Sequence, residues 1–389
     1  MTSRADPLAV ITPGATIGIL GGGQLGRMTA LAARSLGYDV HVLDPDPQCA
    51  ASPLASRVVA APFDDADAAT DLASHCAVVT LEIEQVDRAA LEAVSRHAPM
   101  RPGAEAVVII QDRATQKEWL ARGGYPVAEF KVVHSEQELA DAVAALAPCI
   151  AKTTRGGYDG RGQVRFSVDA ARVASPLAHE AWRALGGRTL VVERELALAL
   201  ELSVMVARHE TGDLVTYPPS VNHHDHGILT WSVTPGALDP RVVREAVALG
   251  EAIATSLSIV GLLAIELFLT RDGTVVVNEL APRPHNSFHQ TERACLTSQF
   301  EQLVRAVCGL PLGAADVAIP GAIHNLLGDV WEAGEPEWER ALAVRGVRLH
   351  LYGKRGPRPG RKMGHLSGVG PTAAEALSRV QQAYNALRD

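Results

Sequence analysis

Short apolar runs alternate with helix-forming segments through the first hundred residues, and this alternation limits the folds open to the chain. Runs typical of strands occupy residues 15–20, 39–45 and 77–84, and a glycine turn leads from the first run into an apolar-periodic helix. Strands separated by helices pair in parallel, because each helix carries the chain back across the sheet. The sequence therefore predicts an α/β, doubly wound N-terminal domain over residues 1–112.

The glycine turn after the first strand admits two interpretations. Gly21, Gly23 and Gly26 fit the pattern G-x-G-x-x-G, and Asp44 ends the next strand. Together they match a dinucleotide-binding fingerprint, in which the helix N-terminus holds a pyrophosphate and the acid holds a ribose hydroxyl. The same turn can instead cradle a different phosphorylated ligand. The turn alone leaves an NAD(P)-dependent oxidoreductase and another nucleotide-binding enzyme both open.

Beyond residue 112 the pattern changes twice. A helix is predicted from Asp112 to the Gly123–Gly124 pair, and strands joined as hairpins then mix with helices, which is typical of an α+β domain. The last part of the chain contains a short strand at 347–353 and a closing helix at 372–387. We therefore predict three domains, over residues 1–112, 113–312 and 313–389.

The stretch 264–283 predicts a β-hairpin that brings two carboxylates together. Asp272-Gly273 is a strong two-residue turn signal between β-rich runs. In a register centred on that turn, Glu266 lies directly opposite Glu279. Facing carboxylates repel each other unless a cation lies between them, and Mg²⁺ binds through one or two carboxylates together with substrate phosphates. The sequence favours a metal site at these two residues, whereas in a shifted register both would be solvated.

A glycine-rich, basic loop at residues 153–163 follows an apolar strand that ends at Lys152. A lysine at a strand end, followed by such a loop, can hold a polyphosphate through its charge and through backbone N–H groups. The loop is not a Walker motif, because G-x-x-x-x-G-K-[ST] is absent. Glu193 and Glu201 flank an apolar strand pair farther along, and either could hold an adenosine.

Two other polar clusters have competing interpretations. The segment NHHDHG at 222–227 contains three histidines, but it lacks the HExxH spacing and an obvious fourth ligand, so the sequence argues against a zinc site there. The basic run at 352–365 is either a solvated loop or part of a binding site for an anion.

Composition excludes several classes of protein. The net charge is −8, from 36 basic and 44 acidic residues, which argues against a nucleic-acid-binding surface. No apolar run approaches the roughly 20 residues that cross a bilayer, and the first residues lack the basic and apolar regions of a signal peptide. The five cysteines show no CxxC spacing, so we expect reduced thiols in a cytoplasmic protein.

Four stretches, taken in order along the chain, carry a resemblance to one enzyme family. They are GGGQLGRM (21–28), GGYDGRGQ (156–163), NELAPRPHNS (278–287) and YGKRGPRPGRKMGHL (352–366). A strand lysine, a glycine-rich loop and a Glu…Asn-Glu hairpin are similar to those of the ATP-grasp superfamily, and the four stretches together resemble the 5-(carboxyamino)imidazole ribonucleotide synthases. The expected fold is accordingly ATP-grasp, with a doubly wound N-terminal domain, a central grasp domain and a small C-terminal domain.

The resemblance implies an ATP-grasp ligase of purine biosynthesis. In that family ATP and Mg²⁺ activate bicarbonate as carboxyphosphate, and the amino group of 5-aminoimidazole ribonucleotide captures the carboxyl group. The resemblance also implies that this chain is a cytoplasmic homodimer, with a downstream mutase as a candidate partner. Two alternatives are a related ATP-grasp ligase, such as a formate-dependent glycinamide ribonucleotide transformylase, and the NAD(P)-dependent oxidoreductase named above.

Matching of the motifs implies a set of residues for each substrate. For ATP and its metal these are Arg113, Lys152, Gly157, Tyr158, Asp159, Gly160, Arg161, Gly162 and Gln163 at the phosphates, Glu193, Arg194, Glu195 and Leu196 at the adenine, Glu201 at the ribose, His224, and Asn278 beside the metal ligands Glu266 and Glu279. For binding of the ribonucleotide they are Gly23, Gln24, Leu25, Glu82, Tyr158 and Arg361. For catalysis they are Asp159, Arg161, Arg283, His285 and Lys354, with Asp159 and His285 both candidates to accept the amine proton.

The chain departs from the family pattern in places. Residues 80–86 read TLEIEQV where TYEFENV is expected, so Glu82 and Glu84 are kept and two aromatic side chains are lost. His324 stands where a small or apolar residue is expected. The glycine loop itself suits the implied chemistry, because carboxyphosphate hydrolyses readily and a glycine-rich loop can close over it and exclude water.

Overall fold

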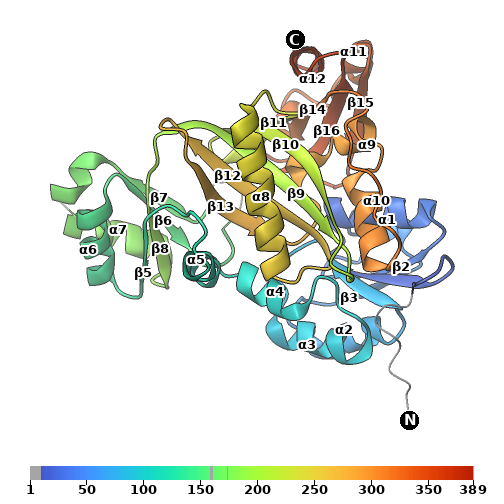
Figure 1. Cartoon of the computed structure of the whole chain (residues 1–389), viewed down its shortest axis with the longest axis horizontal. Helices are drawn as coiled ribbons and strands as arrows, with labels where there is room; N and C mark the ends of the chain where they lie inside the picture. The colour runs from blue at the N-terminus through green and yellow to red at the C-terminus, as the bar shows by residue number, and fades with distance from the viewer. Residues whose placement is uncertain (1–9, 158–160, 173, 389) are drawn as a thin grey trace.

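The computed structural model describes residues 10–157, 161–172 and 174–388, which fold into three β-sheets with helices packed against them (Figure 1). In Figure 1 the N-terminal sheet lies at the lower right and a small four-stranded sheet lies at the left. A long sheet runs between them from the centre toward the C-terminal segment at the top. The predicted combination of a doubly wound N-terminal part with a hairpin-rich remainder is confirmed.

The N-terminal sheet is parallel throughout, with strand order β3-β2-β1-β4. Apolar side chains on one face pack against α1 and α10, and those on the other face pack against α2 and α3, so the sheet is covered on both sides. The strands and their helices are β1 (Thr16–Leu20), α1 (Gln24–Ser35), β2 (Asp39–Asp44), η1 (Ser52–Leu54), β3 (Arg57–Ala60), α2 (Ala66–Ala73), β4 (Val78–Leu81), α3 (Arg88–His97) and α4 (Ala104–Ile110).

The small sheet is antiparallel, with order β5-β8-β6-β7, and helices α6 and α7 cover one of its faces. Successive residues of a strand point to opposite faces, so Cys149 and Ala151 enter this core while Lys152 points to the other side. By the same alternation Glu193 shares the side of Lys152. The elements are α5 (Arg113–Arg122), β5 (Phe130–Val133), α6 (Glu136–Leu146), β6 (Cys149–Thr153), β7 (Gln163–Phe166), η2 (Val168–Arg172), α7 (Ala174–Ala184) and β8 (Leu190–Arg194).

The long sheet has eight strands in the order β13-β12-β9-β10-β11-β14-β16-β15. It continues from the central part of the chain into the C-terminal part without a break, so the predicted division at residue 313 does not coincide with a sheet edge. The three domain ranges stay predictions. The strands are β9 (Leu198–Arg208), β10 (Leu214–Asp225), β11 (Ile228–Thr234), β12 (Gly261–Thr270), β13 (Val275–Ala281), β14 (Gly321–Leu327), β15 (Val347–Leu351) and β16 (Lys362–Val369).

Helices on the long sheet complete the fold. The predicted closing helix at 372–387 is observed as α12, which packs on β14 and β16. The predicted helix after Asp112 is also observed, as α5. The Asp112 side chain caps this helix by accepting a hydrogen bond from Thr115 N–H. The remaining elements are α8 (Pro240–Ser256), η3 (Asn286–Phe288), α9 (Thr291–Ala294), α10 (Gln299–Val307), η4 (Gly328–Trp331), α11 (Trp338–Leu342) and α12 (Ala373–Asn385).

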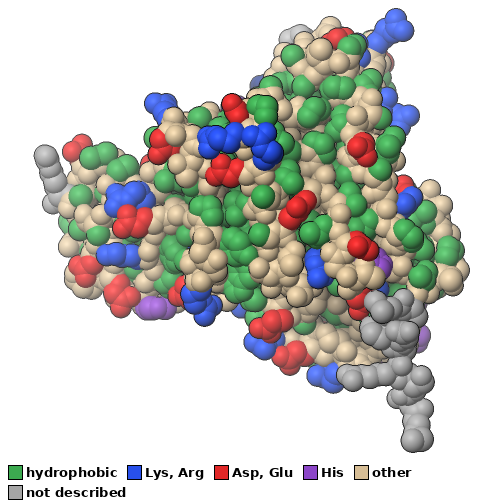
Figure 2. Space-filling view, viewed as in Figure 1, with side chains coloured by type: hydrophobic (Ala, Val, Ile, Leu, Met, Phe, Trp, Pro, Cys, Tyr) green, Lys and Arg blue, Asp and Glu red, His purple; other side chains and the backbone are tan. Residues whose placement is uncertain are grey.

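The surface visible in Figure 2 carries acidic and basic side chains interspersed with apolar ones. On the upper part of that face several Lys and Arg side chains lie together. Among the helices that the structure describes, none combines the length and the apolar character that crossing a membrane would require.

Candidate active site

The hairpin of β12 and β13 pairs Glu266 with Glu279, as predicted. The turn, however, differs from the prediction. Thr270 pairs with Thr274 through a 3.0 Å backbone hydrogen bond, so the connection has three residues, with Gly273 at a φ of 87°. An irregularity in the pairing between Glu266 and Leu267 then restores the register at the carboxylates. The expected two-residue turn was wrong, and a bulge compensates for the extra residue.

The two carboxylates differ in their surroundings. Arg113 Nη2 lies 3.0 Å from Glu279 Oε2, and Asn278 Nδ2 donates to Glu266 Oε2 at 3.3 Å. Burial and the neighbouring Glu279 raise the pKa of Glu266. Burial acts in the same direction on Glu279, but Arg113, Lys152 and Arg283 together outweigh it and lower that pKa. Of the two carboxylates, Glu266 is therefore the one whose charged form the repulsion destabilises more.

The hairpin fits a hard divalent cation. The side-chain oxygen of Asn278 is buried and has no hydrogen-bond partner among the described residues. A buried amide oxygen without a partner is costly unless a ligand takes it up. Together with the carboxylates of Glu266 and Glu279 it provides the oxygen donors that Mg²⁺ prefers.

Cationic side chains surround Glu193 on the inner side of the small sheet. Lys152 Nζ lies 3.0 Å from Glu193 Oε1, and Lys117 Nζ lies 2.9 Å from Glu193 Oε2. Arg113 is 3.9 Å away on the first oxygen. Burial alone would raise the pKa of Glu193, but these cations reverse the shift and hold it far below the ordinary value. Burial is the main cause of the lowered pKa of Lys152, which Glu193 opposes.

Sequence reasoning missed Lys117, which is fully buried. The signal was present, because Lys117 follows Arg113 by four residues on α5 and side chains at this spacing share a helix face. The site therefore has one more cation than the motifs implied.

The glycine-rich loop joins β6 to β7, and its base is closed by backbone bonding. Thr153 N–H donates to Gly162 O at 2.9 Å, and Gln163 pairs with Lys152. Gly162 has a φ of 69°, and a Cβ there would also lie 2.7 Å from the Thr153 hydroxyl. A Cβ at Gly157 would lie 3.1 Å from Arg161 O, a tight but less severe contact. Tyr158, Asp159 and Gly160 lie outside the described residues.

The predicted adenine segment connects the small sheet to the long sheet. Glu193 and Glu201 belong to strands in different sheets, so the predicted strand pair is not a pair. The Arg194 guanidinium turns away to Glu129 at 2.8 Å, and Glu195 forms an ion pair with Arg165. Backbone N–H groups of Arg194 and Glu195 bond to Glu129 O and Pro148 O. The Leu196 N–H has no partner among the described residues, so it can meet a ligand.

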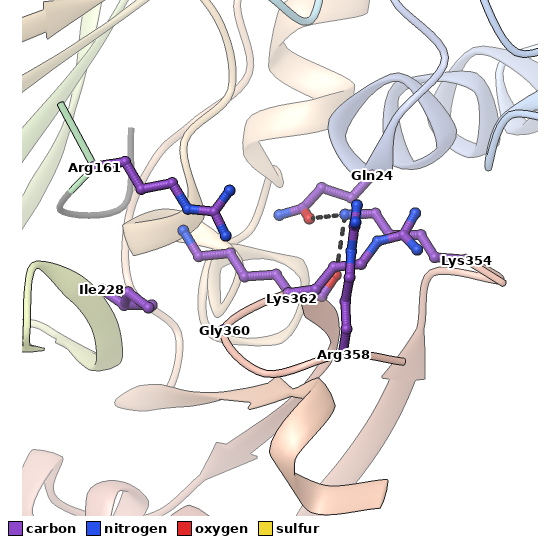
Figure 3. A pocket seen from close by; sticks show the side chains of 8 residues that line it. Gln24, Arg161, Ile228, Lys354, Arg358, Gly360 and Lys362 are labelled. Atoms are coloured by element: carbon purple, nitrogen blue, oxygen red, sulfur yellow. Dashed lines mark hydrogen bonds between the residues drawn. The ribbon is translucent and has the colours of Figure 1, made fainter. Parts of the chain in front are cut away.

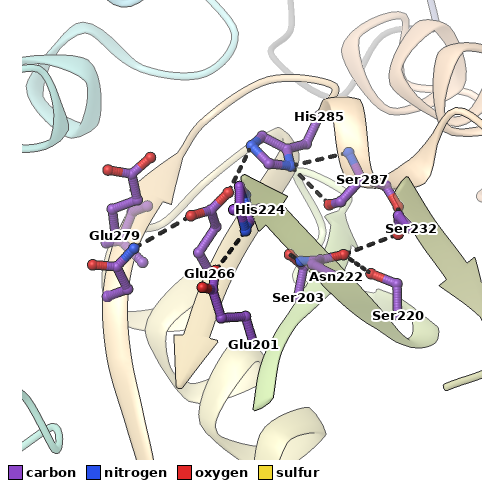
Figure 4. Close-up of polar contacts among 12 residues, drawn as sticks. Glu201, Ser203, Ser220, Asn222, His224, Ser232, Glu266, Glu279, His285 and Ser287 are labelled. Atoms are coloured by element: carbon purple, nitrogen blue, oxygen red, sulfur yellow. Dashed lines mark hydrogen bonds and ion pairs between the residues drawn. The ribbon is translucent and has the colours of Figure 1, made fainter. Parts of the chain in front are cut away.

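Two carboxylate–imidazole pairs lie side by side near the metal hairpin (Figure 4). His224 Nδ1 is 2.5 Å from Glu201 Oε2, and His285 Nε2 is 3.3 Å from Glu266 Oε1. Burial lowers the pKa of His224, but Glu201 and Glu266 outweigh it and raise the pKa. Burial, with Arg283 next, lowers the pKa of His285 well below its ordinary value.

The position of His285 is fixed from two sides. Gln299, which is fully buried at the start of α10, accepts from His285 N–H at 2.8 Å and donates to His285 O at 3.0 Å. Nδ1 of His285 lies 2.8 Å from the Ser287 hydroxyl. The other ring nitrogen therefore faces the site. The remaining histidines of NHHDHG do not join it, since His223 stacks on Trp231 and His226 is exposed.

Glu82 fills the anion position of the N-terminal glycine turn. Its carboxylate accepts from the N–H groups of Gly23, Leu25 and Gly26 at 2.6, 3.0 and 2.9 Å, at the start of α1. Burial raises the pKa of Glu82 despite these hydrogen bonds. In a dinucleotide-binding protein the same N–H groups would hold a pyrophosphate. This carboxylate therefore occupies the space that a cofactor phosphate would need.

The predicted ribose-binding acid is also engaged. Asp44 accepts from Gly22 N–H and Asp46 N–H, each at 2.8 Å, so both of its carboxylate oxygens have partners. Arg283, after β13, forms a 2.8 Å ion pair with Glu84, after β4. The acidic residues at the ends of these N-terminal strands are thus bound to other groups of the protein. The contacts expected for NAD(P) are therefore taken, and the NAD(P) interpretation has no structural support.

A basic cavity of about 240 Å³ lies where the C-terminal loop meets the rest of the chain (Figure 3). Lys354 Nζ donates to Gln24 Oε1 at 2.8 Å and to Lys362 O at 3.0 Å. Arg361 donates to Gly356 O at 3.0 Å, which holds the loop in shape. The sequence analysis assigned no role to Arg358 or Lys362, although both lie in the same basic run as Lys354 and Arg361. The cavity is lined by Gln24, Arg161, Ile228, Lys354, Arg358, Gly360, Arg361 and Lys362.

Three family models match the chain in sequence. They describe a ribonucleotide synthetase preATP-grasp domain over residues 14–111, an ATP-grasp domain over 118–300 and a phosphoribosylaminoimidazole carboxylase C-terminal domain over 321–379. Together they span most of the chain.

Similar proteins agree with these matches. The N5-carboxyaminoimidazole ribonucleotide synthase of Bacillus subtilis is 40% identical, with 92% of each chain covered, and that of Brucella melitensis is 39% identical, with 93% of this chain and 98% of the relative covered. A solved N5-carboxyaminoimidazole ribonucleotide synthetase with ADP has a TM-score of 0.89 at 37% identity, with 98% of this chain and 99% of the other covered. The Aspergillus clavatus enzyme, solved with ADP and 5-aminoimidazole ribonucleotide, has a TM-score of 0.87 at 31% identity, with 96% and 98% covered. The chain therefore belongs to the N5-carboxyaminoimidazole ribonucleotide synthase family of ATP-grasp ligases.

Proposed function

We propose that this chain carboxylates 5-aminoimidazole ribonucleotide to 5-(carboxyamino)imidazole ribonucleotide, using ATP and bicarbonate through carboxyphosphate. The observation that carries the proposal is the basic cavity, where Gln24, Arg161 and Lys354 meet from three distant parts of the chain. A phosphorylated ribonucleotide needs such counter-charge, and a planar guanidinium suits its phosphate oxygens. The Aspergillus relative was solved in complex with ADP and 5-aminoimidazole ribonucleotide, which supports the same substrate for this chain.

ATP would lie between the two antiparallel sheets that face each other across the site. Lys152 and Arg113 are placed to contact its phosphates, with Lys117 and Glu193 behind them. The N–H of Leu196 would meet the adenine, and Glu201 would meet the ribose. Glu266, Glu279 and Asn278 would hold Mg²⁺, which when bound neutralises phosphate charge and orients the transferred group.

The ribonucleotide phosphate would enter the basic cavity, and its amino group would point toward Arg283 and His285. The Gln299 clamp holds His285 so that one ring nitrogen faces the reacting groups, which suits a general base. Arg283, oriented by Glu84, would hold bicarbonate and the carboxyl group derived from it. Gly23, Gln24 and Leu25 form the turn beneath this site, and Glu82 shapes that turn from inside.

Assembly and location belong to the same proposal. The family resemblance predicts a homodimer, a cytoplasmic location and transfer of the unstable product to a mutase. Sedimentation of the purified chain tests the first of these.

A substrate-dependence assay tests the proposed reaction. We expect ADP release that requires both bicarbonate and 5-aminoimidazole ribonucleotide. Glycinamide ribonucleotide with formate should not support turnover, and NADH should show no change in fluorescence on mixing. ADP release driven by formate, or saturable NADH binding, would contradict the proposal.

A further inference from the structure

A second group of potential metal ligands lies outside the ATP and ribonucleotide sites. Glu292, His350 and His365 each place one ligating atom so that the three atoms lie within 4.8 Å of one another. Glu292 follows the segment of His285 on α9, whereas the two histidines face each other directly across β15 and β16. No role in the proposed reaction uses these three side chains.

His365 shows a binding capacity that the protein itself does not satisfy. Its ring is fully buried, and Nδ1 lies 2.8 Å from the Tyr352 hydroxyl. The other nitrogen, Nε2, is buried without a hydrogen-bond partner among the described residues. Because Tyr352 engages Nδ1, Nε2 is the ring nitrogen left to bind a ligand. A hydrogen bond on one ring nitrogen that orients the other is the usual arrangement of a metal-bound histidine.

The other two side chains can close on the same point. His350 is partly exposed, and its Nδ1 lies 4.0 Å from Glu292 Oε2. Glu292 lies near the surface, so its carboxylate can move without disturbing the core. The rings of His350 and His365 stack with their centroids 5.1 Å apart. Ligands around a tetrahedral cation lie at about 2.0–2.2 Å from it, so the His350 ring and the Glu292 carboxylate must both rotate to complete the set.

We propose that Glu292, His350 and His365 form a second metal site, selective for a borderline transition ion such as Zn²⁺ or Co²⁺ over Mg²⁺. Two imidazoles and one carboxylate are the donors that such ions prefer, and a water molecule would take the fourth position. Burial raises the pKa of Glu292, which Arg348 opposes, and burial followed by Arg27 lowers the pKa of His350, so the positive charges of Arg348 and Arg27 lie nearby. This charge weakens cation binding and predicts an exchangeable ion.

A bound ion would tie together two parts of the active-site wall. Glu292 lies seven residues after His285, whereas β15 and β16 carry the two ends of the loop that contains Lys354 and Arg361. Closing the three ligands on one ion would hold that loop against the segment of His285. The expected consequence is added stability of the folded protein in the presence of the ion.

Cobalt titration of the purified full-length chain tests the site, in excess Mg²⁺ so that the proposed metal site at Glu266 and Glu279 is already filled. We expect one saturable Co²⁺ site with visible bands of four- or five-coordinate cobalt and without the near-ultraviolet band of thiolate ligands. His350→Ala and Glu292→Gln should each weaken binding by about tenfold or more. His97→Ala, at an exposed position on α3, is the matched control and should bind as the wild type does.

Thermal unfolding gives a readout that is independent of the spectrum. Co²⁺ and Zn²⁺ should raise the unfolding midpoint of the wild type and of His97→Ala, but not of His350→Ala or Glu292→Gln. The proposal is overturned by the absence of saturable cobalt binding in excess Mg²⁺, by thiolate bands, or by unchanged binding in both ligand variants.

Discussion

Lys354 donates a hydrogen bond to the side-chain oxygen of Gln24 at 2.8 Å, which joins the C-terminal basic loop to the N-terminal glycine turn. The two residues are 330 positions apart in the chain. Gln24 is the first residue of α1, and the turn that presents it is shaped by the Glu82 carboxylate. The phosphate end of the proposed ribonucleotide site therefore depends on both ends of the sequence.

Replacing Lys354 should affect the ribonucleotide far more than ATP. Lys354→Met removes a charge from the basic cavity, and a lost charge-assisted hydrogen bond costs about 1.5–3 kcal/mol, or roughly ten- to a hundredfold in affinity or rate. We expect near-normal ATP binding by calorimetry and a loss of ribonucleotide-dependent carboxylation of that size. Lys131→Met, at an exposed position on β5, is the control. Wild-type kinetics in Lys354→Met would identify the basic run as a solvated surface.

Neutralising either facing glutamate should stop ATP turnover. Glu266→Gln and Glu279→Gln each remove a negative ligand for Mg²⁺, and we expect turnover to fall by more than about a hundredfold while circular dichroism stays unchanged. Glu279→Gln should also weaken ATP binding, because Arg113 loses its 3.0 Å partner. Glu118→Gln, on an exposed face of α5, serves as the control. Full turnover at saturating Mg²⁺ in either variant would rule out the metal role of that residue.

The glycine turn should not tolerate a side chain at Gly23. A Cβ there would lie 2.4 Å from Glu82 Oε1, so Gly23→Ala must displace the buried carboxylate. We expect a loss of about 1–3 kcal/mol in the free energy of unfolding, measured with urea. Gly103→Ala is the matched control, because a Cβ at that position meets no atom within 4 Å. Equal stability of the two variants would show that the fold does not require the Glu82 carboxylate to lie against Gly23.

Lys117 should matter for stability although no substrate needs to touch it. Lys117→Met leaves Glu193 with one close ammonium partner in a buried site, and breaking a buried ion pair costs about 3–5 kcal/mol. We expect that loss in urea unfolding, and Lys131→Met should show none. A Lys117→Met/Glu193→Gln double variant should lose less than the sum of the single losses. Additive losses would mean that the two side chains do not interact.

Glu193 also gives stability a pH dependence of definite sign. Its pKa in the folded protein is held below the ordinary value of 4.5, so the unfolded chain takes up the proton first as the pH falls. The stabilisation is fully present above the ordinary value and is lost as the pH falls toward the folded value. As the pH falls below about 4.5, the free energy of unfolding should therefore fall more steeply in the wild type than in Glu193→Gln. Parallel slopes would contradict this assignment.

Local patterns in the sequence predicted much of the fold and the site. Strand and helix periodicity located β1, α1, β2 and α12, and the cap at Asp112 located α5. The pairing of Glu266 with Glu279 was also predicted, although not for the right reason. The turn has one residue more than predicted, which shifts the register by one, and the bulge between Glu266 and Leu267 shifts it back. Turn residues alone do not reveal such a compensation, because a bulge depends on packing across the sheet.

Contacts between distant segments were harder to infer. Nothing local in residues 80–86 shows that Glu82 would cap α1, so the glycine fingerprint suggested a cofactor. Lys117 was overlooked because no motif contains it, although its spacing from Arg113 placed both on one helix face. The role of Arg358 and Lys362 depends on how the basic run folds against Gln24 and Arg161, which only the tertiary structure provides.

The continuity of the eight-stranded sheet links two parts of the proposed site. Glu266 and Glu279 lie on the strands at one edge of that sheet and Lys362 lies on β16 near the other, so a single hydrogen-bonded plate carries all three side chains. Lys152 and Glu193 belong to the small sheet, which the chain joins to the plate through a bridge of Val127 to Val277 and through residues 195–197. We expect any movement of the small sheet relative to the long sheet to take place at these two crossings. Such a movement would open the space between the sheets to ATP and, on closing, exclude water from it.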